Sequence, residues 1–172
     1  MSQLKVNSIV PVGGLPSGSN GGIIQIKQTI KKDVFTTSQA VTSGYTDLTG
    51  LSVAITPSSN SNKVLVVTQI YNGAQSNNVN FFRLLRGSTF IEQPDGTSSG
   101  GANFNAHAFS YYDATYQDST SFSILDSPAT TSETTYKIQM AVTGSTSAIN
   151  AYAGDTGNYY GVSMITAYEV TA

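Results

Sequence analysis

The stretch that decides the fold is FSILDSPATTSETTYKIQMAV, from Phe122 to Val142. Apolar and polar residues alternate on both sides of the polar connection SPATTSETT, and such alternation predicts half-buried β-strands. We therefore predict two strands joined by a turn as an antiparallel hairpin. Similar polar-linked strands recur in residues 45–71, 80–92 and 159–170, so the sequence predicts an all-β protein.

Other strands are predicted by the same alternation. Ile24, Ile26 and Ile30 share one parity and the residues between them are polar, which indicates a strand with one apolar and one polar face. The segment from Lys63 to Tyr71 has an almost unbroken apolar run, which predicts a central strand buried on both faces. Two short strands are expected in residues 45–49 and 51–55, on either side of Gly50.

Turns separate these strands at short intervals. Arg86-Gly87-Ser88 predicts a hairpin turn between strands in residues 80–85 and 89–91. No window shows the apolar spacing of three and four residues that marks a helix. Eight to ten short strands with turns every 8–12 residues are typical of a β-sandwich, a jelly roll or a barrel.

Residues 1–22 differ from the rest of the chain. A short alternating piece contains Leu4, Val6, Ile9 and Val10, and the glycine- and proline-rich run PVGGLPSGSNGG follows it. Such a run ends regular structure and predicts an extended arm or linker. We expect the arm to be mobile in an isolated monomer and to be held by packing against a neighbouring subunit. Residues 23–172 then form the β-domain.

Charge is scarce along the whole chain. Charged residues make up 10% of the sequence and the net charge is -2, against about a quarter charged in an average globular protein. We therefore expect neither nucleic-acid nor membrane binding. The one basic cluster, Lys27, Lys31 and Lys32, is expected at a solvated strand face or strand end.

Several functional classes lack their signature. The absence of cysteine excludes disulfides, thiolate catalysis and cysteine-bound zinc. The N-terminal residues have neither the charged nor the apolar region of a signal peptide, and no apolar run approaches the length of a membrane span. We therefore expect a soluble protein without a cleaved signal.

The chemistry-bearing side chains form no motif. His107 is the only histidine, and a triad with Ser110 or Asp113 would lack the nucleophile elbow. Carboxylates in predicted loops suit calcium but are more often turn residues, and here they are Asp95, Asp113, Asp118 and Asp155. A glycosidase pair from distant strands is not excluded by the sequence. We expect no enzyme, no metal and no cofactor.

Tyrosine is unusually frequent, with ten residues and no tryptophan. Two groups are expected near the surface, namely Tyr111, Tyr112 and Tyr116, and the pair Tyr159 and Tyr160. Three interpretations remain open. They are half-buried strand aromatics, a subunit interface, where tyrosine is enriched, or a surface that stacks on host glycan.

Four segments together resemble a β-domain of tailed-phage virion proteins. They are a TPxSxxSK-type turn at residues 56–63, an FRLLRDGT-type hairpin at 82–89, a YLDSPxTTxxxTYKVQ-type segment at 125–139 and an IT-x-x-E-type strand at 165–169. The resemblance covers residues 45–172, and MSQLKVNSI resembles the start of short virion proteins from phages of marine bacteria and cyanobacteria. Residues 86–88 read Arg-Gly-Ser where relatives often have Arg-Asp-Gly.

The resemblance implies a trimeric, jelly-roll-like β-sandwich in a virion, and it carries no catalytic residue. We expect a capsid decoration protein, either a cement protein or a head fibre, whose arm binds the major capsid protein or another virion protein. The alternative is a short tail fibre or receptor-binding protein that recognises host glycan. A glycan-degrading enzyme is the third alternative. Asp126 and Glu133 are then expected to be turn and loop residues of the scaffold.

Overall fold

The computed structural model describes residues 22–75, 77–96, 104–112, 116–152 and 160–172. Strands form nearly all of the regular structure in this part of the chain, which contains one short 3-10 turn at Val41–Ser43. The strands are β1 (Ile23–Lys31), β2 (Phe35–Thr37), β3 (Thr46–Ile55), β4 (Lys63–Ala74), β5 (Asn78–Arg86), β6 (Thr89–Phe90), β7 (Ala108–Tyr112), β8 (Tyr116–Asp126), β9 (Thr134–Val142), β10 (Ser147–Ile149) and β11 (Ser163–Val170). No helix in the described residues is long and apolar enough to cross a membrane.

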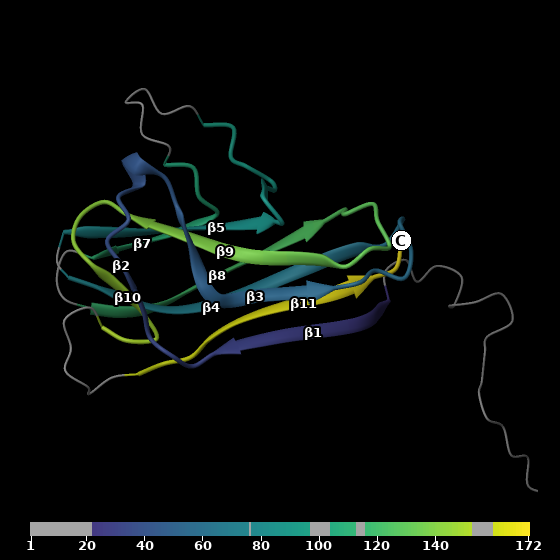
Figure 1. Cartoon of the computed structure of the whole chain (residues 1–172), viewed down its shortest axis with the longest axis horizontal. Coiled ribbons are helices and arrows are strands. Elements are labelled where there is room, and N and C mark those ends of the chain that lie inside the picture. The colour runs from purple at the N-terminus through teal and green to yellow at the C-terminus, as the bar shows by residue number, and fades with distance from the viewer. Residues whose placement is uncertain (1–21, 76, 97–103, 113–115, 153–159) are drawn as a thin grey trace, which may run out of the picture.

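The strands form two antiparallel sheets packed face to face (Figure 1). The six-stranded sheet has the order β1-β11-β4-β10-β2, with β8 on the other side of β4, and the five-stranded sheet has the order β3-β9-β5-β6, with β7 also paired to β5. Without the short strands β2, β6 and β10, the orders become β1-β11-β4-β8 and β3-β9-β5-β7. This is the order of a jelly roll built from two Greek keys, so the predicted jelly-roll-like sandwich is confirmed.

The predicted hairpin from Phe122 to Val142 is wrong. Its first strand belongs to β8, which pairs with β4, while its second strand is β9, which pairs with β3 and β5 in the other sheet. The polar connection therefore crosses from one sheet to the other. It spans residues 127–133, too long to impose the tight pairing of a two-residue turn, and both strands bury their apolar faces against each other across the core.

The hairpin at Gly87 is confirmed. Leu85 pairs with Phe90 and Arg86 pairs with Thr89, which leaves a two-residue loop. Gly87 has a φ of 58°, and glycine at the first loop position is a feature of tight hairpin turns. Only the first loop residue, Gly87, has a positive φ, so Gly87-Ser88 makes the type II′ kind of hairpin turn.

Two further strand predictions need correction. β4 is central, as expected, but only one of its faces is buried, because Val64 and Val66 point into the core while Val67 is exposed. A two-layer sandwich has nothing that covers the outer faces of its sheets. Residues 46–55 form one strand rather than two, because the shift in pairing between Asp47 and Ser52 is absorbed by a bulge that includes Gly50, at a φ of 83°.

The core lies between the two sheets. The five-stranded sheet contributes Phe82, Ile138 and Met140, and the six-stranded sheet contributes Val66, Ile70 and Ile165, all fully buried. Each such side chain stabilises the fold by about 1.5–3 kcal/mol relative to an exposed one. This main core explains how a chain without cysteine holds two sheets together.

Candidate assembly surfaces

The residues that carry the family resemblance meet at one end of the sandwich. Asp126, the last residue of β8, is buried and accepts two hydrogen bonds from Arg86 Nη1, each 2.8 Å long. The Tyr136 hydroxyl donates to the same carboxylate at 2.7 Å, and burial together with this carboxylate raises the pKa of the tyrosine. Asp126 is thus a buried anchor at a strand end rather than a turn residue, whereas Glu133 lies exposed in the connection as expected.

A second buried carboxylate lies in the same row of the sheet. Glu169 pairs with Val64, and Val64 pairs with Asp126, so all three side chains point inward. Glu169 Oε1 accepts hydrogen bonds from the Ser58 N–H at 2.6 Å, the Ser58 hydroxyl at 2.7 Å and the Asn62 amide at 2.6 Å. The closing strand therefore holds the turn between β3 and β4. The four motif segments form two hydrogen-bonded clusters that join the sheets.

The pKa of Glu169 reflects this environment. Burial by itself would raise the pKa, but the hydrogen bonds from Asn62 and Ser58 together outweigh burial and lower it. The carboxylate is therefore ionised at neutral pH and acts as an acceptor only. It stabilises the turn between β3 and β4.

The outer face of the six-stranded sheet carries an apolar surface. Ile26 of β1 pairs with Tyr168 of β11, Tyr168 pairs with Leu65 of β4, and Leu65 pairs with Leu125 of β8. Directly paired residues point to the same side of a sheet, so these four side chains cross it from edge to edge. We call this surface the isoleucine face and define it by Ile26, Ile30, Leu65, Val67, Leu125 and Tyr168.

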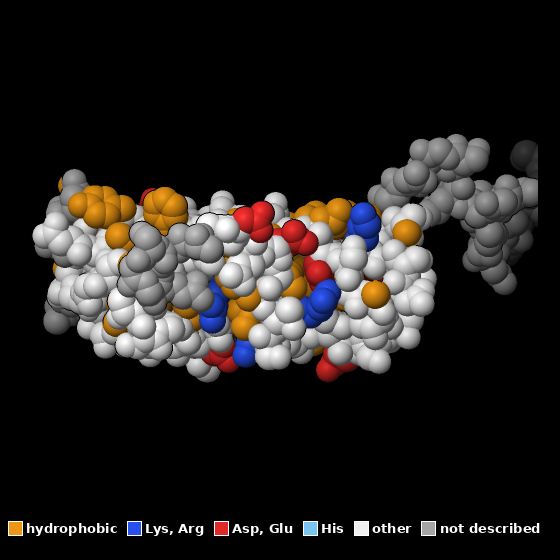
Figure 2. Space-filling view, turned by 90° about the horizontal axis from the view of Figure 1, so that it is seen from above, with side chains coloured by type: hydrophobic (Ala, Val, Ile, Leu, Met, Phe, Trp, Pro, Cys, Tyr) orange, Lys and Arg blue, Asp and Glu red, His pale blue; other side chains and the backbone are white. Residues whose placement is uncertain are grey.

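Basic side chains of β1 lie on the opposite side from the isoleucine face. Lys31 pairs with the inward-facing Ser163 and is only 3% exposed, with its ammonium 2.5 Å from Asp33 Oδ2. The expectation of a solvated Lys31 is therefore wrong, because the parity of the strand turns this side chain into the sandwich. Lys27 shares this parity but remains exposed, as does Lys32 after the strand end. Figure 2 shows the opposite side of the molecule, above the five-stranded sheet, where separate blue and red groups are scattered among white and orange ones.

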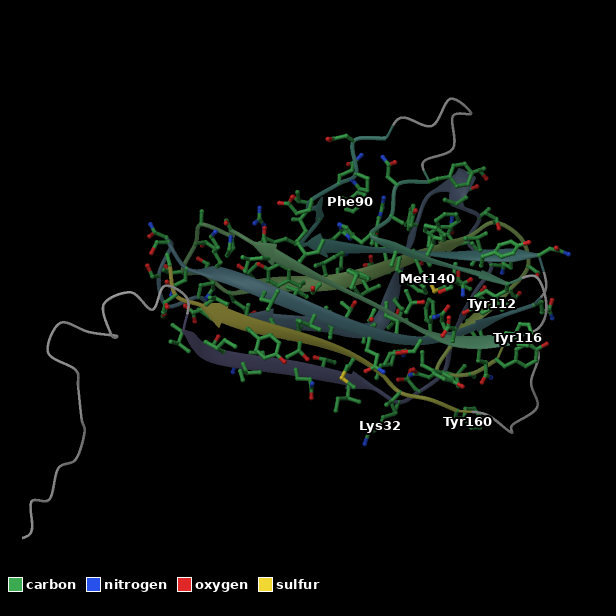
Figure 3. The ribbon with its side chains drawn as sticks, turned by 180° about the vertical axis from the view of Figure 1, so that it is seen from behind. Lys32, Phe90, Tyr112, Tyr116, Met140 and Tyr160 are labelled. Carbon is green, nitrogen blue, oxygen red and sulfur yellow. The ribbon has the colours of Figure 1, made fainter. Side chains whose placement is uncertain are left out.

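The structure separates the predicted tyrosines. Tyr111, Tyr116 and Tyr160 are 63%, 62% and 65% exposed, and Tyr116 and Tyr160 lie toward the same end of the sandwich (Figure 3). Tyr111 projects from the outer face of the five-stranded sheet, where its partner is Val79. Tyr159 lies outside the described residues.

Tyr112 is wrongly predicted as a surface residue. It is buried, and its hydroxyl donates to Asn72 Oδ1 at 2.7 Å between the two sheets. Asn80 donates to the same oxygen at 2.9 Å, so these side chains satisfy one another's polar groups. Strand alternation is the signal that could have found this, because adjacent Tyr111 and Tyr112 must point to opposite faces.

His107 has its two ring nitrogens engaged by backbone groups. Nδ1 accepts a hydrogen bond from the Leu84 N–H at 2.9 Å, so Nε2 carries the proton and donates to the Ile91 carbonyl at 2.9 Å. The ring lies between Phe90 and Phe122, and burial lowers its pKa. The Ser110 hydroxyl forms its hydrogen bond with the Thr120 hydroxyl rather than with the histidine ring. The structure thus does not bring Ser110 and His107 together as a catalytic pair.

The acidic loop residues are not gathered in the described part of the chain. That part contains no group of three or more histidine or acidic residues able to hold a metal ion. Asp118 lies in β8, where its carboxylate accepts from the neighbouring Ser119 N–H, and Asp95 is exposed. Asp113, Asp155 and the predicted arm residues Leu4, Val6, Ile9 and Val10 lie outside the described residues.

Gly22 marks where the predicted arm joins the domain. Its N–H donates to Thr171 Oγ1 at 3.0 Å, and the Thr171 N–H donates back to the Gly22 carbonyl at 3.0 Å. Gly22 therefore lies beside the C-terminal end of β11, at the edge formed by β1 (Figure 1). The isoleucine face begins at this same end of the sheet, at the pair Ile26 and Tyr168.

Comparison with known proteins identifies no family and one distant structural likeness. No protein-family model matches the chain, and no curated protein matches it. Among solved structures, the chain resembles one of infectious bursal disease virus, Gt strain, with 11% sequence identity and a TM-score of 0.45. The match covers 98% of this chain and 43% of that chain, so this chain spans less than half of its length. So distant a likeness carries no argument about function, and the fold assignment above depends on the strand order alone.

Proposed function

We propose that this chain is a structural protein of a virus particle, and that the particle is a tailed phage. The observation that carries the proposal is the pair of buried clusters at Asp126 and Glu169, which join the four segments that resemble phage virion β-domains. Contacts among these four segments give a physical reason for their occurring together in one sequence. A jelly roll is also an architecture of viral capsid and lectin domains.

Within that class, we propose capsid decoration as a cement protein or head fibre. The arm of residues 1–22 would bind the major capsid protein or another virion protein, and its alternating Leu4, Val6, Ile9 and Val10 suit addition of a strand to a partner's sheet edge. The chain would then be located in the virion. By its family resemblance it would also act as a homotrimer, and sedimentation of the purified chain measures this.

The arm is tested by binding to particles that lack the chain. Replacing Leu4, Val6, Ile9 and Val10 by serine should abolish binding, as deletion of residues 2–22 should. Replacing the alternate polar residues Lys5 and Asn7 by serine is the matched control and should leave binding intact. Undiminished binding of the deletion variant would remove the arm from the proposal.

A tail fibre or receptor-binding protein is the second candidate. Exposed Tyr116 and Tyr160 at one end of the sandwich favour it, because aromatic rings beside polar strand residues suit stacking on host glycan. Counting the copies in each virion by mass spectrometry separates the two candidates. Hundreds of copies indicate decoration, whereas a few to a few dozen indicate a fibre. Adsorption to host cells that Tyr116→Ala and Tyr160→Ala weaken would also favour the fibre.

A further inference from the structure

We propose that the isoleucine face is the contact surface between two copies of this chain. The face spans four adjacent strands and is continuous from one edge of the sheet to the other. Ile26 at the β1 edge is 59% exposed, and Leu125 at the β8 edge is 48% exposed. Large aliphatic side chains that lie together on an exposed sheet face mark an interaction site rather than a solvated surface.

The orientation of β1 is the first argument. An edge strand of a sandwich normally turns its apolar side to the core and its polar side to water. In β1 the direction is reversed, since Ile26 and Ile30 face outward while Lys27 and Thr29 have the inward parity. The sequence pattern of this strand therefore requires a covering that the described residues of the chain do not supply.

The register excludes a simple slip of the strand. A shift by one residue would exchange the two faces, but the pairing with β11 runs without a break from Gln25 to Lys31. The Gln28 amide donates to Thr166 Oγ1 at 2.9 Å on the outer face, and the Asn150 amide donates to the Lys31 carbonyl at 2.8 Å at the end of the strand. The register of β1 against β11 therefore fixes Ile26 and Ile30 on the outer face of the sheet.

The chemistry of the face indicates a second copy as its occupant. Among the described residues of β1, β4, β8 and β11, Lys63 is the only charged side chain on this face, and it lies at one end, paired with Val170. The remaining positions are aliphatic or carry amide and hydroxyl groups, such as Gln28 and Ser123. A charged partner would leave its charges unpaired here. An identical face offers the same aliphatic rows and hydrogen-bonding rows, which is the self-complementarity that a two-fold contact between identical subunits requires.

The experiment uses the purified full chain and sedimentation velocity. The wild-type chain should associate through this face, and Ile26→Glu should lower the affinity of that association by about 30-fold or more because a charge is buried unpaired. Lys27→Glu is the matched control, since it places the same residue on the next position of the same strand with the opposite parity. It should leave association unchanged. Leu125→Glu, at the other edge of the face, should act like Ile26→Glu, and it serves in place of Ile26→Glu if that variant does not fold.

Three results would overturn the inference. The first is a wild-type chain that remains monomeric at about 0.1 mM. The second is a folded Ile26→Glu or Leu125→Glu chain that associates like the wild type. The third is a loss of association on deletion of residues 2–22, which would mean that the arm makes the contact between copies. The inference does not depend on the proposed virion role, because self-association is measured without any particle.

Discussion

Substitution of the buried carboxylate at Glu169 by an amide should destabilise the fold measurably. Ser58 and Asn62 direct three hydrogen bonds of 2.6–2.7 Å to Glu169 Oε1. A bond to a charged acceptor contributes about 1.5–3 kcal/mol and a bond to a neutral one about 0.5–1.5 kcal/mol, so Glu169→Gln weakens the set by about 3 kcal/mol. Removal of a buried charge offsets part of this loss, which leaves a net cost of about 1–2 kcal/mol.

The effect should depend on pH in a defined direction. The folded state lowers the pKa of Glu169 below its ordinary value of 4.5. The ionised carboxylate therefore stabilises the folded state above about pH 4.5, and this contribution is lost as the pH falls through the lowered pKa. The difference in stability between the wild type and Glu169→Gln should be complete at neutral pH and should shrink in acid.

Thermal unfolding followed by circular dichroism provides the assay. A cost of about 1–2 kcal/mol corresponds to a fall in Tm of about 2–8 °C for a chain of this size. Glu133→Gln is the matched control, because it makes the same chemical change at an exposed loop position, and it should leave Tm almost unchanged. Equal Tm values for the two variants would refute the reasoning, as would a difference that stays constant into strong acid.

Three further perturbations test other parts of the structure. Gly161→Ala should destabilise the fold by about 1–3 kcal/mol in urea unfolding, since the new Cβ would lie 2.3 Å from Tyr71 Cγ; a neutral effect would mean that the ring moves freely. Tyr112→Phe should cost about 0.5–1.5 kcal/mol because it removes one of the two hydrogen bonds to Asn72 Oδ1, whereas Tyr111→Phe should cost almost nothing, and the reverse order would contradict the assigned burial. The sole histidine, His107, should titrate below pH 6.5 by NMR, because burial lowers its pKa, and protein stability should fall as the pH drops below about 6.5; a pKa above 6.5 would oppose the described tautomer.

Much of the local structure could be predicted because it depends on local pattern. Alternation located most of the strands, and the glycine at position 87 located the β5–β6 turn. The connection after Asp126 could not be assigned in the same way. A polar loop of intermediate length is compatible both with a hairpin and with a crossing between sheets, and only the pairing of β8 with β4 decides between them.

The candidate surfaces were harder to predict than the strands. Sequence singled out the tyrosines by their number, yet burial separates Tyr112 from Tyr111, and this depends on which side of β7 meets the core. It identified the two-faced character of β1 but could not assign a direction to it. Leu65, Tyr168 and Leu125 come from three distant segments, and no local signal relates them to Ile26.

By itself, the sequence determined that the chain is an all-β protein of low charge. Those properties follow from alternation, composition and short turn signals, which act within a few residues. The tertiary structure alone decided that β8 and β9 face each other across the core, and that the isoleucines of β1 point to solvent. The physical reason is that strand alternation defines two faces without saying which one meets the core, and long-range pairing alone resolves that choice.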